Sequence, residues 1–209
     1  SPWSSLTANY DLDSLRKSAL LWSERQNANS IFLLNQVSNI VHVGGGFEVY
    51  ERSLVEILDQ KGVDEWKETN IKYHGNYEKV KIQKAAVVKP NGQSLSADTQ
   101  GTKIVFKNLE PGDIIEIKWR RRHFYPGKLA KNFDSKFYLA KSIPVLRYHF
   151  ETIYPLGTDF KVKQHLNKVK PVQFTHQGRE FQVWTLDTVK AYKPENRSVT
   201  QDVAWPWIQ

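Results

Sequence analysis

The chain has 209 residues, with 30 Lys and Arg against 22 Asp and Glu, a net charge of +8 and a pI near 9.5. It contains no cysteine, which excludes thiol catalysis, thiolate zinc sites and disulfide frameworks. The length suits one large domain or two small ones, and no apolar run approaches the roughly 18 residues that span a bilayer.

The basic excess lies partly in Lys118–Lys141 and partly in Lys161–Lys170. It favours anionic partners such as acidic glycans, nucleic acid or membrane surfaces, although a solvated lysine-rich surface also explains it. The chain begins at Ser1 and lacks methionine, so we expect a processed protein or a piece of a longer one.

The first predicted element is a helix near the N-terminus. Apolar side chains recur three or four residues apart, at Leu12, Leu15, Ala19 and Trp22. This spacing gives one apolar helical face, and Asp11 or Asp13 is placed to cap its N-terminus. The helix either docks on the sheet that follows or ends an upstream domain.

From Ser30 onward the pattern is that of β-strands. The runs "SIFLLNQVSNIVHV" and "FEVYERSLVEIL" flank three glycines, Gly44–Gly46. Because glycine adopts positive φ at no steric cost, these runs predict a hairpin.

The clearest strand is "YEKVKIQKAAVVKPNGQSL", which a Pro90–Gly92 turn interrupts. Its alternation predicts one buried face formed by Val80, Ile82, Ala86 and Val88. Lys84 breaks this apolar face.

The next stretch, "KIVFKNLEPGDIIEIKW", alternates over Lys103–Lys107 and again over Ile115–Trp119. Pro111 and Gly112 supply turn chemistry between the two runs. We therefore expect the two runs to pair as antiparallel strands joined by this turn, in a structural role.

Further strands are predicted in "VLRYHFETIYP", "DFKVKQHL", "VQFTH" and "EFQVWTLDTVKAY", with a tight hairpin at Gln177-Gly178. The segment 124–144 has no clean period and predicts a long loop, and no further helix is expected. Strands without alternating helices indicate a mainly β fold, an antiparallel two-layer β-sandwich with a short N-terminal helix.

The sequence offers no local catalytic or metal-binding pattern. The six histidines form no H-E-x-x-H or other close ligand pair. The nearest match to a nucleophile elbow, "GQSLS" at Gly92, lacks the second glycine and follows a hairpin turn. We therefore expect no enzyme activity and no catalytic, cofactor-binding or metal-binding residue. A hydrolase would require dispersed carboxylates to converge in a cleft.

The most suggestive surface feature is "WRRRHFYPG". Trp119, Arg120, Arg122 and Tyr125 are candidate contacts for an anionic ligand, because arginine and aromatic rings together bind phosphate, sulfate or acidic sugars. In a strand Arg121 points away from Arg120 and Arg122, and solvated arginines at a strand end are the simpler alternative.

Four segments in this order resemble the DUF3857 family, a domain of unknown function: "YEKVKIQKAAVVKPNGQ", "FKNLEPGDIIEIKW", "RYHFETIYPLGT" and "FQVWTLDTVKAYKPE". The likeness covers about Asn29–Glu195. It implies a β-sandwich that precedes a transglutaminase-like domain in bacterial proteins, often from Bacteroidetes. That neighbouring domain would carry the catalytic Cys, His and Asp, so none is expected here.

The resemblance divides the chain into a helical segment 1–28, a sandwich domain 29–195 and a linker 196–209. It implies an exported, periplasmic or cell-surface location. The first hypothesis is a non-catalytic accessory domain whose tail residues Trp205, Trp207 and Ile208 dock on the downstream papain-type domain. The second is a module that binds an anionic polymer such as an acidic glycan. Nucleic acid is a weaker variant, because no known nucleic-acid-binding signature is present.

Overall fold

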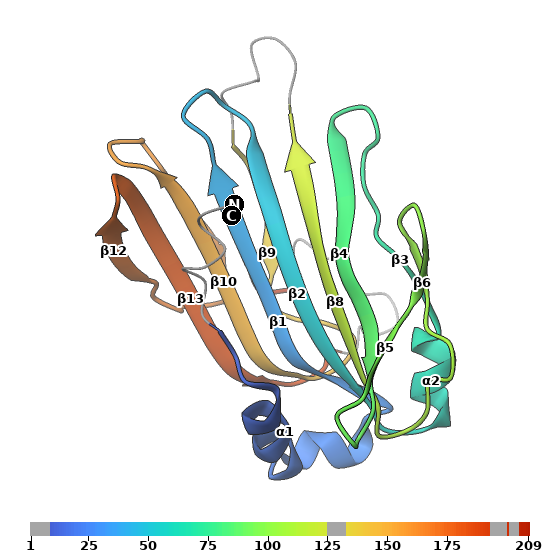
Figure 1. The fold of residues 1–209 in the computed structure, drawn as a ribbon. Helices are drawn as coiled ribbons and strands as arrows, with labels where there is room; N and C mark the ends of the chain where they lie inside the picture. Colours follow the sequence, from blue (N-terminus) through green and yellow to red (C-terminus); the bar gives the residue numbers. More distant parts are fainter. Residues whose placement is uncertain (1–8, 125–132, 193–199, 201–204) are drawn as a thin grey trace.

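The computed structural model describes residues 9–124, 133–192, 200 and 205–209. Its main element is a large sheet made of β1 (Ser30–Val41), β2 (Phe47–Ile57), β4 (Glu78–Val88), β5 (Ser94–Ser96), β8 (Ile114–His123), β10 (Val145–Pro155), β12 (Val172–His176) and β13 (Arg179–Val189). The eight strands lie in the order β12-β13-β10-β1-β2-β8-β4-β5, as Figure 1 shows. The prediction of a mainly β protein is confirmed.

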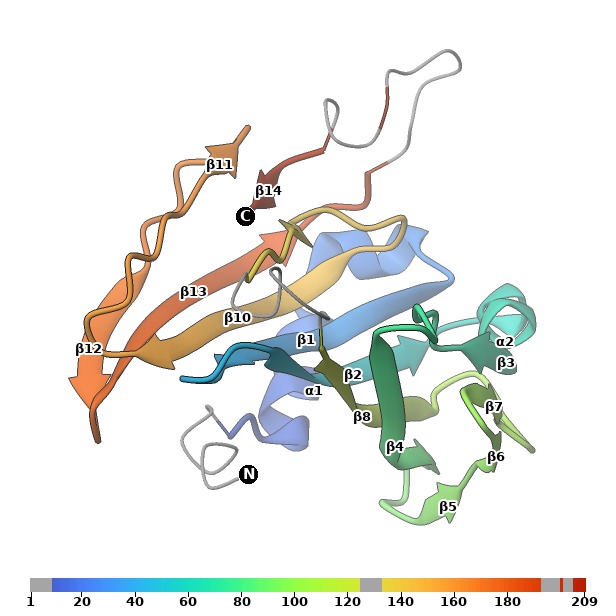
Figure 2. The ribbon, with the colours of Figure 1, turned by 90° about the horizontal axis from the view of Figure 1, so that it is seen from above.

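Two small sheets form a second, incomplete layer. One has the order β11-β14-β9 and the other the order β3-β7-β6. Their strands are β3 (Glu68–Asn70), β6 (Asp98–Gln100), β7 (Lys103–Val105), β9 (Phe137–Tyr138), β11 (Gln164–His165) and β14 (Trp207–Ile208). Figure 2 shows β9, β11 and β14 on one side of the large sheet and the N-terminal helix on the other.

The helices are α1 (Leu12–Leu20), α2 (Gln60–Trp66) and a 3₁₀ turn at Ser23–Asn27. The prediction of α1 is confirmed, and the cap is Asp11, whose carboxylate accepts from Ser14 N at 2.8 Å. α2 was not predicted from the sequence. None of the helices among the described residues is long and apolar enough to cross a membrane.

The two faces of the large sheet differ. The inner face, which carries Val37, Ile115 and Trp119, packs against the small sheets and α2 in the main hydrophobic core. The outer face carries α1, whose Leu15 and Ala19 are buried against the ends of the central strands. The helix therefore docks on the sheet, one of the two alternatives that the sequence left open.

One pair in the large sheet is parallel. β1 and β10 run side by side in the same direction, whereas the other neighbouring strands of this sheet are antiparallel. A parallel pair needs a long crossover connection, and here the strands from β2 to β9 lie between its members in the chain. The predicted sheet was wholly antiparallel, because local patterns carry no information about pairs so far apart.

The strand predicted at 77–95 is present, and Val80 and Ile82 lie on the inner face as predicted, but the predicted face fails beyond Ile82. A bulge between Ile82 and Lys84 shifts the register against β8. After the bulge the inner face continues with Ala85 and Val87, while Ala86 faces outward with Lys84. An extra residue flips every following side chain to the other face, which explains why Lys84 seemed to interrupt the pattern.

The predicted pairing of 103–107 with 115–119 is wrong. β7 pairs with β3 and β6, while β8 pairs along its whole length with β2 and β4. Asn108 has a φ of 54°, so the connection leaves β7 in a new direction. The long β8 pairs with partners of similar length rather than with a strand of three residues. The hairpins at 42–46 and 177–178 are confirmed.

Candidate functional site

The predicted binding residues around β8 lie on opposite faces of the sheet. Trp119 is buried on the inner face and carries the Arg121 guanidinium 5.1 Å above its ring. Arg120 and Arg122 point from the outer face, as the strand period of two requires. Tyr125 lies outside the described residues. The structure therefore brings Arg120 and Arg122 together but separates them from Trp119.

Both arginines share one buried carboxylate. Glu48 Oε1 lies 3.3 Å from Arg122, and Glu48 Oε2 lies 3.9 Å from Arg120. Burial alone would raise the pKa of Glu48, but the Tyr50 hydroxyl bond and the two arginine charges hold that pKa below its ordinary value. Glu48 therefore stays ionised and holds both arginines in place. Its single negative charge neutralises only one of the two arginine charges.

The outer face of β4 and β8 carries a wider set of cations. Directly opposed pairs across these strands are Lys79 with Arg122, Lys81 with Arg120, and Lys84 with Lys118. Like charges directly opposite one another repel, so these pairs lower the stability of the sheet unless other charges offset them. Glu116 accepts contacts from Lys84, Lys118 and Arg52, which relieves part of the repulsion. The residual positive charge can attract anions. We call the six residues of the three opposed pairs the cation ladder: Lys79, Lys81, Lys84, Lys118, Arg120 and Arg122.

The tail residues proposed for docking pack against this chain. Ile208 is 1% exposed and lies in the main core, and Trp207 forms β14 between β9 and β11. Trp205 is half-buried and meets the rings of Tyr138 and Tyr192 edge-on, at 6.2 and 5.1 Å. The described end of the tail is therefore a strand of this domain rather than a linker, and Ile208 is not available to a partner.

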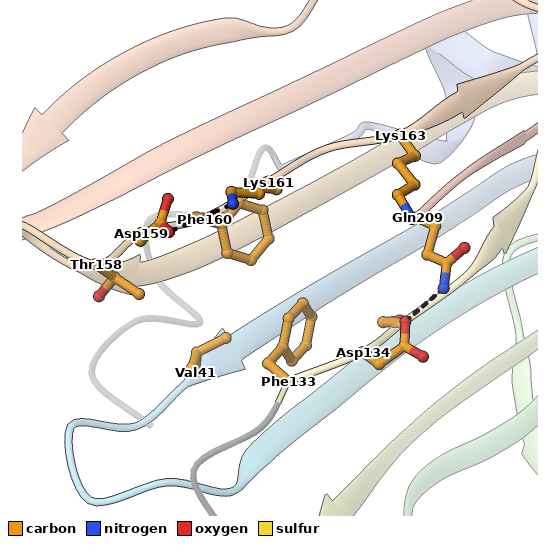
Figure 3. Close-up of a pocket in the computed structure, with 10 residues that line it drawn as sticks. Val41, Phe133, Asp134, Thr158, Asp159, Phe160, Lys161, Lys163 and Gln209 are labelled. Carbon is orange, nitrogen blue, oxygen red and sulfur yellow. Dashed lines mark hydrogen bonds and ion pairs between the residues drawn. The ribbon is translucent and has the colours of Figure 1, made fainter.

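A pocket of about 480 Å³ lies beside the last residue. Figure 3 shows its lining, in which Phe133 and Phe160 stand near Val41 while Asp134, Lys161 and Lys163 surround the opening. Gln209 Nε2 donates to Asp134 at 2.8 Å, and the Gln209 backbone exchanges two hydrogen bonds with Lys163. The described chain end is thus fixed at a mixed aromatic and charged surface.

A row of aromatic rings continues from this pocket along the inner face. Phe160 stacks on Tyr154 at 4.3 Å and contacts Phe133 at 5.6 Å. Phe133 meets Phe47 edge-on at 4.8 Å, and Phe47 stacks on His123 at 4.6 Å. The row packs elements from β10, β2 and β8 together, so we assign it a structural role.

A polar network is buried on the outer face. Ser38 donates to Glu151, whose other oxygen lies 3.4 Å from His149 Nε2. His149 Nδ1 in turn lies 3.0 Å from the Tyr10 hydroxyl. The serine bonds the carboxylate and not the imidazole, so the arrangement lacks the nucleophile-to-base contact that acyl transfer requires. No local pattern indicates this network, because its members lie in three separate segments of the chain.

Within the described ranges, no group of three or more His, Cys, Asp or Glu could hold a metal ion. Two surfaces among the described residues are candidates for binding: the cation ladder and the pocket beside Gln209.

A family model described as "Domain of Unknown Function with solved-structure structure (DUF3857)" matches residues 44–105 and 93–193. Among curated proteins, none matches this chain. A crystal structure described as a putative protease from Parabacteroides distasonis ATCC 8503 is similar, with a TM-score of 0.74 and 17% identity. The alignment covers 86% of this chain but 39% of that one, so this chain spans about two fifths of its length.

Two further structures are M1 zinc metallopeptidases. One, from Deinococcus radiodurans, has a TM-score of 0.44 and 11% identity over 87% of this chain and 42% of that one. A two-domain variant bound to L-arginine has a TM-score of 0.45 and 11% identity, over 86% and 42%. These scores are too low to carry an argument, and the Parabacteroides structure supports the fold alone.

Proposed function

Since the chain belongs to the DUF3857 family, we propose that it is a non-catalytic accessory domain of a longer protein. Its role would be to pack against a downstream papain-type, transglutaminase-like domain or to present substrate to it. The resemblance also favours export to the periplasm or cell surface of a bacterium. This chain resembles only a part of the Parabacteroides structure, which agrees with a domain that works within a larger polypeptide.

The observation that carries the proposal is the position of the described chain end. β14 lies in the small sheet, and Gln209 is held by Asp134 and Lys163 at the rim of the 480 Å³ pocket. A domain that followed Gln209 would begin at this surface. The pocket is lined by two exposed lysines, Lys161 and Lys163, and by an aromatic wall. This mixture of charge and apolar area is typical of interdomain contacts.

The test begins by reading the native gene beyond the codon for Gln209. If a domain with ordered Cys, His and Asp follows, the two domains are produced separately and their association is measured by isothermal titration calorimetry. Lys161→Glu with Lys163→Glu should weaken association about tenfold, the scale of two partly solvated charge contacts. The matched control reverses Lys168 and Lys170, which are exposed in the same segment but do not line the pocket. A stop codon after Gln209, or equal affinity of both variants, contradicts the proposal.

A second candidate function is binding of an anionic polymer such as an acidic glycan, which the cation ladder favours. The side chains of Arg122 and Lys84, on the outer face of β8 and β4, are 59% and 42% exposed. Nucleic acid fits less well, because Trp119 faces the core and cannot stack on bases. The wild-type protein should elute from heparin at higher salt than Arg120→Ala with Arg122→Ala. The Lys168→Ala with Lys170→Ala control should elute close to wild type. Unchanged retention of the arginine variant excludes this site.

A further inference from the structure

The first part of β4 forms an uncovered edge of the large sheet. β5 pairs with β4 only at Ala86–Val88, and the Ala97 amide donates to the Ala85 carbonyl. Beyond this point the chain leaves β4, and β6 stands apart from it and pairs with β7 in a different sheet (Figure 1). Among the described residues, no strand pairs with this side of Lys79–Gln83, and no backbone hydrogen bond is made there. These residues therefore present unpaired backbone groups.

The two faces of β4 differ in chemistry along this edge. Lys79 and Lys81 are exposed on the outer face. Val80 and Ile82 lie on the inner face and are only partly buried, because no strand covers them from the edge side. Side chains of an added strand would alternate between the same two faces. The edge therefore suits a strand that places acidic residues beside the lysines and apolar residues beside Val80 and Ile82.

The positive charge at this edge is not neutralised from within the described chain. Lys79 and Lys81 form no ion pair there, and they lie directly opposite Arg122 and Arg120 of β8. The nearby carboxylate, Glu48, lies on β2 and is already shared by the two arginines. Negative charge is therefore supplied from the β2 side of β8, and none is supplied from the open side of β4.

A second copy of this edge is a poor partner. Antiparallel pairing of two β4 edges would bring lysine side chains of both copies together, and like charges on neighbouring strands repel. Lysine on an edge strand is a common protection against such self-pairing. An acidic strand meets no repulsion of this kind. The same side chains that disfavour a second copy therefore favour a partner of opposite charge.

We propose that the Lys79–Gln83 edge of β4 binds an extended segment of another protein in which acidic and apolar residues alternate. The segment would add a strand to the large sheet. Its backbone would supply hydrogen bonds, and its alternate side chains would supply specificity. The carboxylates would form charge-assisted contacts with Lys79 and Lys81.

This inference rests on the positive charge of the cation ladder, as the second candidate function does. It also needs the backbone edge of β4, which an acidic glycan does not use. The two can therefore fail separately, and neither depends on the accessory role.

The test uses acetylated and amidated peptides, which are titrated into the 209-residue chain at constant pH and ionic strength. The peptide EVEVE should give saturable NMR shifts at the backbone amides of Lys79–Gln83. The amides of β12, at the opposite edge of the sheet, should not move. The peptide KVKVK should bind at least about tenfold more weakly, because its charges repel the lysines. EVEVE with methylated backbone nitrogens keeps its charge but cannot donate the hydrogen bonds of an added strand, so it should also bind at least about tenfold more weakly.

Lys79→Glu with Lys81→Glu reverses the charge of the edge and should weaken binding of EVEVE about tenfold or more. The variant should fold, because it places acids opposite Arg122 and Arg120 in the register.

The matched control is Lys168→Glu with Lys170→Glu, at exposed positions just before β12, and it should bind EVEVE as wild type does. Equal binding of KVKVK, equal binding of the methylated peptide, or no saturable shift at Lys79–Gln83 with EVEVE overturns the proposal. Heparin retention that depends on the arginines, without binding of EVEVE, also overturns it and leaves an acidic glycan as the ligand of this surface.

Discussion

The Tyr10 hydroxyl lies 3.0 Å from His149 Nδ1 and joins residues that are 139 positions apart. The backbone carbonyl of Tyr10 also accepts from Arg52 at 3.3 Å, and Arg147 lies over its ring at 5.4 Å. Through these contacts the segment before α1 is fastened to β2 and β10 on the outer face. Tyr10 thus completes a buried network that ends at Glu151 and Ser38.

Tyr10→Phe should destabilise the protein by about 1–2 kcal/mol, because it leaves one nitrogen of the buried His149 without its partner. The free energy of unfolding is measured by urea denaturation. Tyr73→Phe, at a tyrosine that is 46% exposed, should change it by less than about 0.5 kcal/mol. Equal stability of both variants would show that the hydroxyl contributes nothing to holding the N-terminal segment.

The protein should lose stability in acid partly through Glu116. Burial alone would raise the pKa of Glu116, but the Lys84 hydrogen bond and the charges of Lys118 and Arg52 outweigh it and lower that pKa. When the pKa of a carboxyl group is lower in the folded protein than in the unfolded one, the ionised group stabilises the fold. This stabilisation is present above about pH 4.3, the pKa of the unfolded state. That contribution is lost as the pH falls through the folded-state pKa.

The free energy of unfolding of the wild type should therefore fall more steeply below about pH 4.3 than that of Glu116→Gln. The variant should already be weaker at pH 7 by about 2 kcal/mol, since it replaces a charged acceptor. Glu65→Gln should keep the wild-type slope, because its side chain is exposed and has no ion pair among the described residues. Parallel curves for wild type and Glu116→Gln in acid would refute the assignment.

Gly62→Ala should destabilise the protein although it lies in a helix. In an open helix alanine is better than glycine by about 1 kcal/mol. Here a Cβ would stand 2.2 Å from the Asn29 carbonyl oxygen, a backbone atom that cannot easily move. Overpacking of this kind costs about 1–3 kcal/mol or more, so we expect a net loss of about 2 kcal/mol in thermal or urea unfolding. Gly44→Ala meets nothing within 4 Å and should be nearly neutral. A Gly62→Ala protein as stable as wild type would mean that α2 shifts freely.

Ile208→Ala tests whether the tail belongs to the domain. Its side chain is 1% exposed in the main core, and truncation of such a residue costs about 2–5 kcal/mol. Leu166→Ala, at a leucine that is 65% exposed, is the control and should cost little. The comparison is made by urea denaturation of the full chain. If Ile208→Ala lowers the free energy of unfolding by less than about 0.5 kcal/mol, the tail is a linker and does not contribute to the core.

Local patterns predicted much of the fold. The 3.6-residue period of Leu15 and Ala19, the cap at Asp11 and the glycine turn before Phe47 all act within one or two turns of chain. These features appear in the structure as the pattern predicts. The bulge at Ile82 and Lys84 escaped prediction, because the partner strand fixes the register there.

The site residues were harder to predict. The strand period separates Arg120 and Arg122 from Arg121, and the same rule places Trp119 on the inner face with Arg121. The cation ladder depends on which strands are neighbours. That choice follows from packing over the whole sheet, and no local spacing records it.

The parallel pair between β1 and β10 has a consequence for the order in which the protein is made. Ser38 and its partner Glu151 are 113 residues apart, so during synthesis β1 and β2 leave the ribosome long before β10 can cover the free side of β1. Until then the nascent chain presents a long unpaired strand edge, the kind of edge that pairs with other chains. Pairing of β10 with β1 is a slow folding step, because it joins residues that are far apart in the chain. A chaperone that shields β1 during translation would therefore raise the yield of folded protein more than one that acts after release.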